Sequence, residues 1–389
     1  MNKNFKIEKG ITLIALVITI IILLILAGIS ISALTNQGLF KNAKVAQNAT
    51  EKAEAEQAQR LNEYEDEINK YLNNSNKDKK NVKLVANNIN KVLSTTDNTE
   101  LKDAKENKIV VPAGFKIVEG ATTVDKGIVI EDVTETATKG SQFVWIPVGT
   151  ITKVDGTTTT VTLGRYSFDS TTGVESVFSG SWVEEDANDI STLKNYGNII
   201  AKNITNFKNS VATNGGYYIG RYEARTATAR SAKTDALTQI TEKGTENVYN
   251  FVTQSQAAQL SQNMYTSEKF TSDLINSYAW DTAIVFIQNC GTNTKYSRQV
   301  SFNKSLLQTG TNSLTDASKI DVQCNIYDMA SNIWERTTET SFLSNVPCVY
   351  RGGLYNYSSS YASFRDINDT SSSTSNSDFG FRPILYVNV

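Results

Sequence analysis

The stretch KGITLIALVITIIILLILAGISI, residues 9–31, constrains the chain most, because residues 11–31 contain no charged side chain. About twenty helical residues at about 1.5 Å each span about 30 Å, the thickness of a bilayer's hydrocarbon core. In lipid, only a helix satisfies its own backbone polar groups. A cleaved secretory signal would have a shorter apolar region and a small-residue cleavage site, whereas this run continues into a charged segment. We therefore expect residues 11–31 to form a retained membrane helix.

The leader before this helix is basic, with Lys3, Lys6 and Lys9 against a single acidic residue, Glu8. Positive charge beside a membrane helix keeps that end in the cytoplasm. The sequence thus predicts a single-pass membrane protein whose N-terminus is cytoplasmic and whose remaining residues face outward.

The junction between leader and helix has Gly10 directly before Ile11. This pattern resembles the class III leader of type IV pilins and pseudopilins. The resemblance implies cleavage after Gly10 by a prepilin peptidase, N-methylation of Ile11, assembly with other pilins or pseudopilins, and a final place on an extracellular pilus or the cell surface. Most such proteins have Glu at the fifth mature position, where this chain has Ala15, so a minor or tip subunit is favoured over a shaft subunit. A plain signal anchor is the alternative.

Composition excludes several kinds of site. The 389 residues include no histidine, which removes Ser-His-Asp and Cys-His catalysis and most zinc sites. The formal net charge is -2, so the chain has no excess of positive charge that would indicate nucleic-acid binding. The three cysteines, Cys290, Cys324 and Cys348, lack CxxC spacing and allow at most one disulfide within the chain.

Composition and hydrophobic periodicity divide the rest of the chain into segments. Small and apolar residues in 32–73 recur mostly three or four apart among charged ones, which predicts an amphipathic helical extension. Residues 74–106 are polar and lack this period, so they are predicted as a linker. Short β-type runs then alternate with turn residues, and 257–264 and 273–288 have helical patterns. We predict a leader at 1–10, a transmembrane helix at 11–31, an extension at 32–73, a linker at 74–106 and an α+β domain at 107–389.

Six phrases of the last domain resemble, in the same order, anchors of the formylglycine-generating enzyme (sulfatase-modifying factor) family, a branch of the C-type lectin fold. They are FVWIPVG at 143–149, GYYIGRYE at 216–223, YAWDTA at 278–283, YDMASNIWE at 327–335, RGG at 351–353 and GFRP at 380–383. The resemblance implies an irregular lectin-like domain with these structural anchors: Trp145, Trp280, Asp328, Asn332, Trp334, Glu335, Arg351, Gly352, Gly353, Gly380, Phe381 and Arg382. Buried Arg351 and Arg382 would each need a carboxylate or several carbonyls as partners, and Asp328 and Glu335 are the natural candidates.

The chemistry of that family is not expected to carry over. The enzyme binds copper through two cysteines of its C-terminal region, but no cysteine follows Cys348, and relatives with an iron site rely on histidine. We therefore expect no enzymatic activity and no cofactor. Two alternatives stay open: a residual oxidase that binds copper through Cys324 and Cys348, and a calcium site with oxygen ligands around Asn332.

Between the RGG and GFRP phrases lies LYNYSSSYASFRDINDTSSSTSNSDF, residues 354–379. Such polarity is normally that of a solvated loop. The interleaved aromatics also match the composition of antibody binding loops, in which aromatic rings supply contact area and small polar residues supply hydrogen bonds. This second interpretation predicts ligand binding through 355–378. The predicted ligand-contacting residues are Tyr355, Asn356, Tyr357, Ser359, Tyr361, Ser363, Phe364, Asp366, Asn368 and Asp369.

The same segment resembles the variable region of proteins diversified by retroelements, in which adenine-directed substitution yields these residue types between fixed anchors. The resemblance implies that 355–369 vary while the anchors hold the scaffold. The sequence therefore predicts a minor or tip pilin-like surface subunit that displays a non-catalytic lectin-like domain, binds a glycan or protein, and acts as an adhesin or receptor-binding protein. A purely structural pseudopilin of a secretion or pilus system is the alternative.

Overall fold

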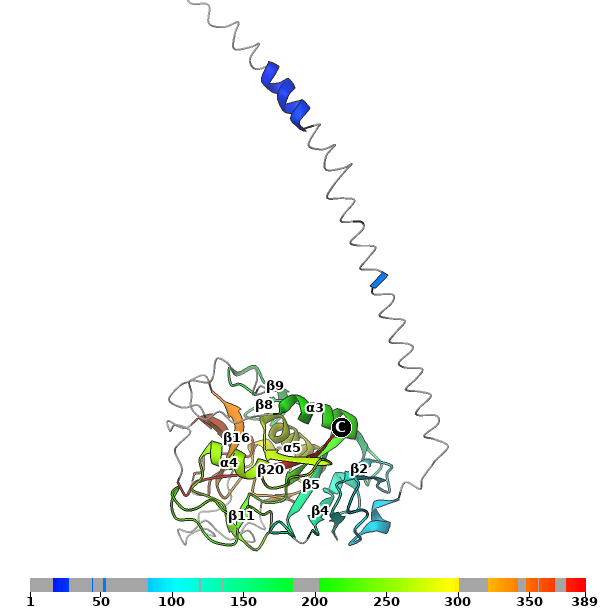
Figure 1. Ribbon diagram of the computed structural model, residues 1–389, viewed down its shortest axis with the longest axis vertical. Coiled ribbons are helices and arrows are strands. Elements are labelled where there is room, and N and C mark those ends of the chain that lie inside the picture. The colour runs from blue at the N-terminus through cyan, green and yellow to red at the C-terminus, as the bar shows by residue number, and fades with distance from the viewer. Residues whose placement is uncertain are drawn as a thin grey trace, which may run out of the picture. The chain divides into compact units, whose positions relative to one another are not determined.

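The computed structural model describes residues 17–27, 44, 52–53, 83–118, 120–134, 136–184, 203–300, 321–341, 348–355, 357–367 and 376–389. The chain divides into two units, Met1–Asn81 and Val82–Val389. Figure 1 labels the elements of the second unit. The second unit is called the body below. The predicted processing residues, Gly10 and Ile11, lie outside the described residues, as does nearly all of the predicted extension at 32–73.

The described helix of the first unit covers residues 17–27, and its large apolar side chains are about half exposed. At about 1.5 Å per residue this helix is about 16 Å long, roughly half of a bilayer's hydrocarbon core. None of the described residues belongs to a helix that is both long and apolar enough to cross a membrane. This finding overturns the predictions of a long membrane or pilin helix and of a single-pass membrane protein that ends on a pilus or cell surface.

The body is β-rich, so the predicted α+β class is corrected as well. Its largest sheet is antiparallel, with strand order β13-β20-β10-β5-β4-β3. The strands are β3 (Phe115–Ile117), β4 (Val129–Asp132), β5 (Gln142–Pro147), β10 (Gly216–Gly220), β13 (Phe270–Leu274) and β20 (Pro383–Val387). The physical reason for the correction is that most apolar runs of the body are short, rich in Val, Ile, Phe and Tyr, and interrupted by turn residues.

A four-stranded sheet with order β18-β17-β16-β19 carries the predicted ligand-binding segment. Its strands are β16 (Trp334–Thr340), β17 (Cys348–Arg351), β18 (Arg365–Ile367) and β19 (Phe379–Phe381). Strands β16 and β19 are parallel, whereas the other pairs are antiparallel. The register sets Glu335 opposite Arg351 and Arg351 opposite Arg365. The anchor phrases at 327–335, 351–353 and 380–383 therefore meet in or beside one small sheet.

Five two-stranded sheets complete the regular β-structure of the described residues. They pair β1 (Thr99–Lys102) with β2 (Lys108–Val111), β6 (Gly149–Thr152) with β7 (Thr158–Val161), β8 (Tyr166–Phe168) with β9 (Glu175–Val177), β11 (Arg225–Thr226) with β12 (Asn247–Val248), and β14 (Val322–Gln323) with β15 (Ile326–Tyr327). Strand β1 lies within 74–106, the range predicted as a linker.

Three α-helices of the body are described: α3 (Ile204–Asn214), α4 (Gln254–Gln262) and α5 (Ser277–Cys290). Short 3-10 helices cover η1 (Val85–Asn88), η2 (Val124–Lys126) and η5 (Tyr296–Arg298). The two helices predicted from sequence are confirmed as α4 and α5, although residues 273–274 belong to β13. Helix α5 begins where Asn276 accepts a hydrogen bond from the Ala279 N–H, an N-cap that satisfies an otherwise unpaired backbone donor.

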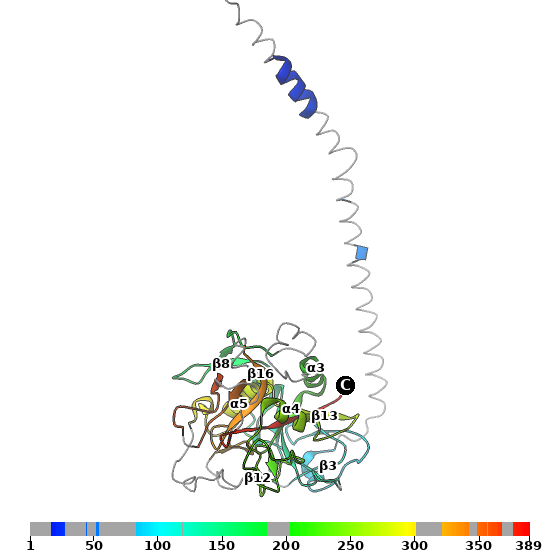
Figure 2. The same cartoon turned by 60° about the vertical axis from the view of Figure 1, so that its left-hand side comes forward.

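The six-stranded sheet curls so that its two edge strands approach each other. Phe115 of β3 and Phe270 of β13 meet edge to face, with ring centroids 5.7 Å apart. Phe143 and Tyr265 join the same aromatic group. Figure 2 shows β13 and β3 on the same side of the body.

Candidate functional site

The predicted ligand-binding segment is fastened to the body through its main chain. The Ala362 N–H donates to the Gln299 carbonyl at 2.9 Å, and the Ser363 N–H donates to the Ser297 carbonyl at 3.1 Å. Trp280 donates from Nε1 to the Ala362 carbonyl at 3.0 Å. These bonds tie the segment to α5 and η5, so its described part is not a free solvated loop.

Two small side chains of the segment are buried, while aromatic ones reach the surface. Ser360 and Ala362 are fully buried. Ser360 Oγ accepts a hydrogen bond from the Leu354 N–H and donates to the Tyr357 carbonyl, both at 3.0 Å. By contrast, Tyr357 is 46% exposed and Tyr361 is half-buried. The backbone is therefore fixed independently of the larger side chains that it presents.

A continuous group of rings connects this segment with the four-stranded sheet. We define the aromatic face as Trp334, Tyr350, Tyr357, Tyr361, Phe364 and Phe379. Tyr350 and Phe379 are buried with centroids 5.2 Å apart, and Trp334 lies 5.6 Å from Tyr357. Phe364 contacts Tyr350 at 6.1 Å and Tyr361 at 5.5 Å. Such contacts contribute about 0.5–1.5 kcal/mol per pair beyond area burial, so the exposed rings are held in place before any partner arrives.

Polar groups surround the aromatic face. The Arg298 guanidinium lies 3.6 Å from the ring centroid of Tyr361, a close cation–π contact. Tyr350 donates its hydroxyl to Asp366 at 3.3 Å. Trp334 Nε1 is buried without a hydrogen-bond partner, a state that buried indole groups usually avoid. The face thus offers apolar area together with charged and polar groups.

The structure brings together most of the predicted ligand-contacting residues. Tyr357 and Ser359 are exposed, whereas Tyr355, Tyr361, Ser363, Phe364 and Asp366 are half-buried. The predictions for Asn356, Asn368 and Asp369 lie outside the described residues. Sequence reasoning missed Tyr350, Phe379 and Arg298, because these residues join the face through strand register and through packing of a distant segment.

Anchor residues beneath the face form buried ion pairs. Arg382 donates to Glu335 at 2.6 and 3.0 Å and to the Gly220 carbonyl at 3.0 Å, so its predicted partner is confirmed. Arg351 pairs instead with Asp281 and Glu339, so neither of the two predicted candidates is its partner. Asp328 has a positive φ of 64° and accepts a hydrogen bond from Ser331.

Three arginines and two carboxylates make up what we call the arginine cluster: Arg165, Arg351, Arg365, Asp281 and Glu339. Arg365 contacts Asp281 at 2.6 Å and Glu339 at 3.0 Å, and Arg165 also pairs with Glu339. Arg351, Asp281 and Glu339 are fully buried at the side chain. The cluster joins β17 and β18 to α5 and β16, so it holds the chain on both sides of residues 352–364, which we call the presented segment.

The remaining anchors are packing positions. Gly352 has a φ of +85°, and a side chain at Gly353 would collide with the Ala330 carbonyl, so both positions require glycine. Trp145 is buried against Tyr218, with centroids 5.0 Å apart. Gly380 lies opposite Glu335 in the parallel pair of β16 and β19, and Phe381 packs edge to face on Tyr249.

Glu223 lies beneath the start of the presented segment. Burial raises its pKa to about 7, against the opposing effect of Arg225, whose Nη2 lies 3.0 Å from the carboxylate. Asn332 donates its side-chain amide to Glu223, and the Asn332 carbonyl accepts the N–H of Tyr355 at 2.9 Å. A titrating carboxyl is therefore linked to the segment through one residue.

Neither thiols nor carboxylates form an evident metal centre in the part of the chain that the structure describes. No group of three or more Cys, Asp or Glu side chains there is arranged to hold an ion. Cys290, Cys324 and Cys348 are free thiols. Burial raises the pKa of Cys290 to about 12 and also raises that of the other two.

No known family model matches the chain, and no curated protein matches its sequence. Among solved structures, Treponema denticola variable protein 1 shows a likeness with a TM-score of 0.31 and 10% identity, covering 64% of this chain and 98% of that one. This likeness is too weak to assign a fold or a function to the body.

Proposed function

We propose that the body is a non-catalytic binding domain whose aromatic face, together with the polar residues of the same segment, recognises a protein partner. The observation that carries this proposal is a backbone fixed by main-chain hydrogen bonds beneath rings that reach the surface. Rigid aromatic side chains supply contact area at low entropic cost, and small polar neighbours supply adaptable hydrogen bonds.

The chemistry of the cysteines supports a role without catalysis. A thiolate, and not a thiol, is the nucleophile and the metal ligand. Because burial raises the pKa of Cys290 to about 12, that thiol stays protonated near neutral pH. The chain also lacks histidine to accept a proton from it.

A selection experiment tests the binding role. Codons for Tyr357, Ser359, Tyr361, Ser363 and Phe364 would be randomised in the full chain, and the displayed library would be selected for binding to hen-egg lysozyme as an arbitrary protein. We expect specific binders among variants that stay folded. Each lost ring contact should cost about 0.5–1.5 kcal/mol, but the backbone remains held by main-chain hydrogen bonds and by Trp280.

A library of equal size at the exposed hairpin between β6 and β7 serves as the control, with Val154, Asp155, Thr157, Thr158 and Thr160 randomised. Fewer binders are expected there, because the first library adjoins rings that are not randomised: Trp334 contacts position 357 and Tyr350 contacts position 364. General unfolding of the first library, or equal recovery from both libraries, would contradict the proposal and favour a purely structural role for the segment.

We also propose that this segment is diversified in nature, a hypothesis that rests on its residue types. Deep sequencing of the codons for 354–379 across a cell population should find substitutions concentrated at adenines, with a near-copy of the segment close by in the DNA. An invariant segment without a near-copy would refute diversification while leaving the binding role to the library experiment.

A further inference from the structure

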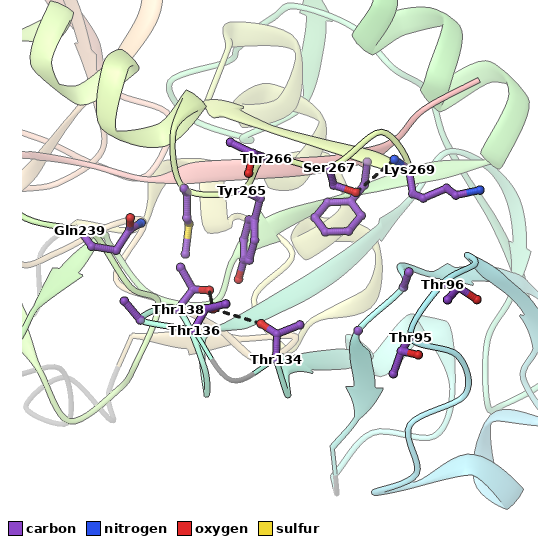
Figure 3. A pocket seen from close by; sticks show the side chains of 15 residues that line it. Thr95, Thr96, Thr134, Thr136, Thr138, Gln239, Tyr265, Thr266, Ser267 and Lys269 are labelled. Carbon is purple, nitrogen blue, oxygen red and sulfur yellow. Dashed lines mark hydrogen bonds between the residues drawn. The ribbon is translucent and has the colours of Figure 1, made fainter.

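A cavity of about 340 Å³ opens where the edge strands β3 and β13 approach each other (Figure 3). Its lining shares no residue with the aromatic face, so it is a separate feature of the body. The volume falls in the range of small-molecule sites, about 300–1,000 Å³. Threonine hydroxyls from the segment between β4 and β5 lie on one side, and side chains of 264–270 lie across from them.

A buried carboxylate, Asp132, organises the hydroxyl side of the cavity. Its Oδ1 accepts hydrogen bonds from Thr134 Oγ1 at 2.5 Å and from the Thr134 N–H at 2.8 Å. Its Oδ2 accepts from Thr138 Oγ1 at 2.6 Å and from the Tyr265 hydroxyl at 3.2 Å. Burial, and then Asp132 itself, raise the pKa of Tyr265 well above its ordinary value, so its phenol remains a donor.

The three threonine hydroxyl groups have fewer hydrogens to donate than they have hydrogen-bonding contacts. Thr136 Oγ1 lies 3.1 Å from Thr134 Oγ1 and 2.8 Å from Thr138 Oγ1. Both neighbours already donate to Asp132, so Thr136 would have to donate to both with a single hydrogen. One of these oxygen pairs therefore has no hydrogen between its members, and the three oxygens have acceptor capacity to spare. A ligand that brings hydroxyl donors matches this wall.

The opposite side is apolar, and Lys269, the charged residue among the described lining residues, is paired. Met264 and Phe270 are buried at 5% and 6% exposure, and Tyr265 presents its ring beside them. At the rim, Lys269 pairs with Asp97 at 3.3 Å, and both side chains are exposed. The charge of the lysine is thus compensated, which favours a neutral ligand over an anionic one.

We propose that this cavity binds a neutral saccharide, whose hydroxyls donate to Thr136 and its threonine neighbours and whose C–H face packs on Tyr265 and Phe270. A sugar combines many hydroxyl donors with an apolar ring face, and the two walls of the cavity divide these properties between them. The site does not depend on the aromatic face.

Binding would be measured by calorimetry on the full chain with methyl α-mannoside, methyl β-galactoside and N-acetylglucosamine as probes. At least one should bind saturably. Thr136 is exposed, and Thr136→Val keeps the shape of its side chain while removing the hydroxyl. This variant should bind the probe about three- to tenfold more weakly, which is the effect of one hydrogen bond. Thr136→Ser should bind like the parent chain.

Thr150→Val on β6 is the matched control, because Thr150 is exposed and its hydroxyl also pairs with another threonine, Thr160, at 2.9 Å. It should leave binding unchanged, and so should Tyr357→Ala on the aromatic face. The proposal is overturned if none of the three probes binds saturably, if Thr136→Val and Thr150→Val have equal effects, or if Thr136→Ser binds as weakly as Thr136→Val.

Discussion

Replacing Asp281 by Asn should lower the free energy of unfolding by about 3–5 kcal/mol, the cost of leaving buried charge without its partner. Asp281 contacts Arg351 and Arg365, and the Tyr166 N–H donates to it at 2.8 Å. Without this carboxylate, three arginines of the arginine cluster would share Glu339 alone. Burial and the neighbouring Arg365 both lower the pKa of Arg351, and Asp281 opposes them.

The measurement is urea unfolding of the full chain followed by tryptophan fluorescence. Glu175→Gln is the control, since Glu175 is an exposed carboxylate on β9 and its loss should change stability by less than about 0.5 kcal/mol. Amide hydrogen exchange should also increase in 360–367, because Arg351 and Arg365 hold that segment. A loss below about 1 kcal/mol with unchanged exchange would show that the cluster does not fix the segment.

Stability should fall as the pH rises from about 4.5 to about 7. The pKa of Glu223 is about 7 in the folded chain, against an ordinary value of 4.5, so the folded state holds a proton that the unfolded state has released. This contribution is fully present below about pH 4.5 and is lost as the pH passes 7. A shift of about 2.5 units corresponds to about 3 kcal/mol. Burial raises the pKa of Glu335 and Glu242 as well, so both act in the same direction.

Glu223→Gln should reduce this pH dependence without abolishing it, because the amide oxygen still accepts the hydrogen bond from Asn332 and stays neutral at every pH. Glu175→Gln should retain the full slope. The measurement is the free energy of unfolding in urea at intervals from pH 4 to 8. Stability that rises over this interval in the parent chain, or an unchanged slope in Glu223→Gln, would contradict the assigned role.

Sequence patterns predicted the features of the body that depend on neighbouring residues, namely several strands, turns and helices. Turn residues around short apolar runs indicated strands, and the periods at 257–264 and 273–288 indicated helices α4 and α5. The pairing of Arg382 with Glu335 followed from the cost of burying a lone charge. The prediction from the apolar run near residue 11 was wrong. Composition gives only the greatest possible length of a helix, and the described helix covers residues 17–27.

The sequence could not predict strand register or contacts between segments that lie far apart along the chain. Tyr350 faces the surface rings only because β17 pairs between β16 and β18, and Arg298 reaches Tyr361 from a segment more than sixty residues earlier. The cavity beside β3 and β13 was missed for the same reason, since one wall comes from Thr134, Thr136 and Thr138 and the other from residues such as Tyr265 and Phe270. Threonine clusters in a sequence look like ordinary turns until a buried carboxylate such as Asp132 orders them.

The position of β20 has a consequence for the order in which the body can form. This strand follows every other strand of the six-stranded sheet along the chain, yet it lies between β13 and β10. Until β20 has been synthesised, β10 and β13 have no partner between them, and their open edges are available to other chains. Completion of the sheet is therefore a late, long-range step, which favours slow folding and makes a nascent chain vulnerable to aggregation until its last strand is in place.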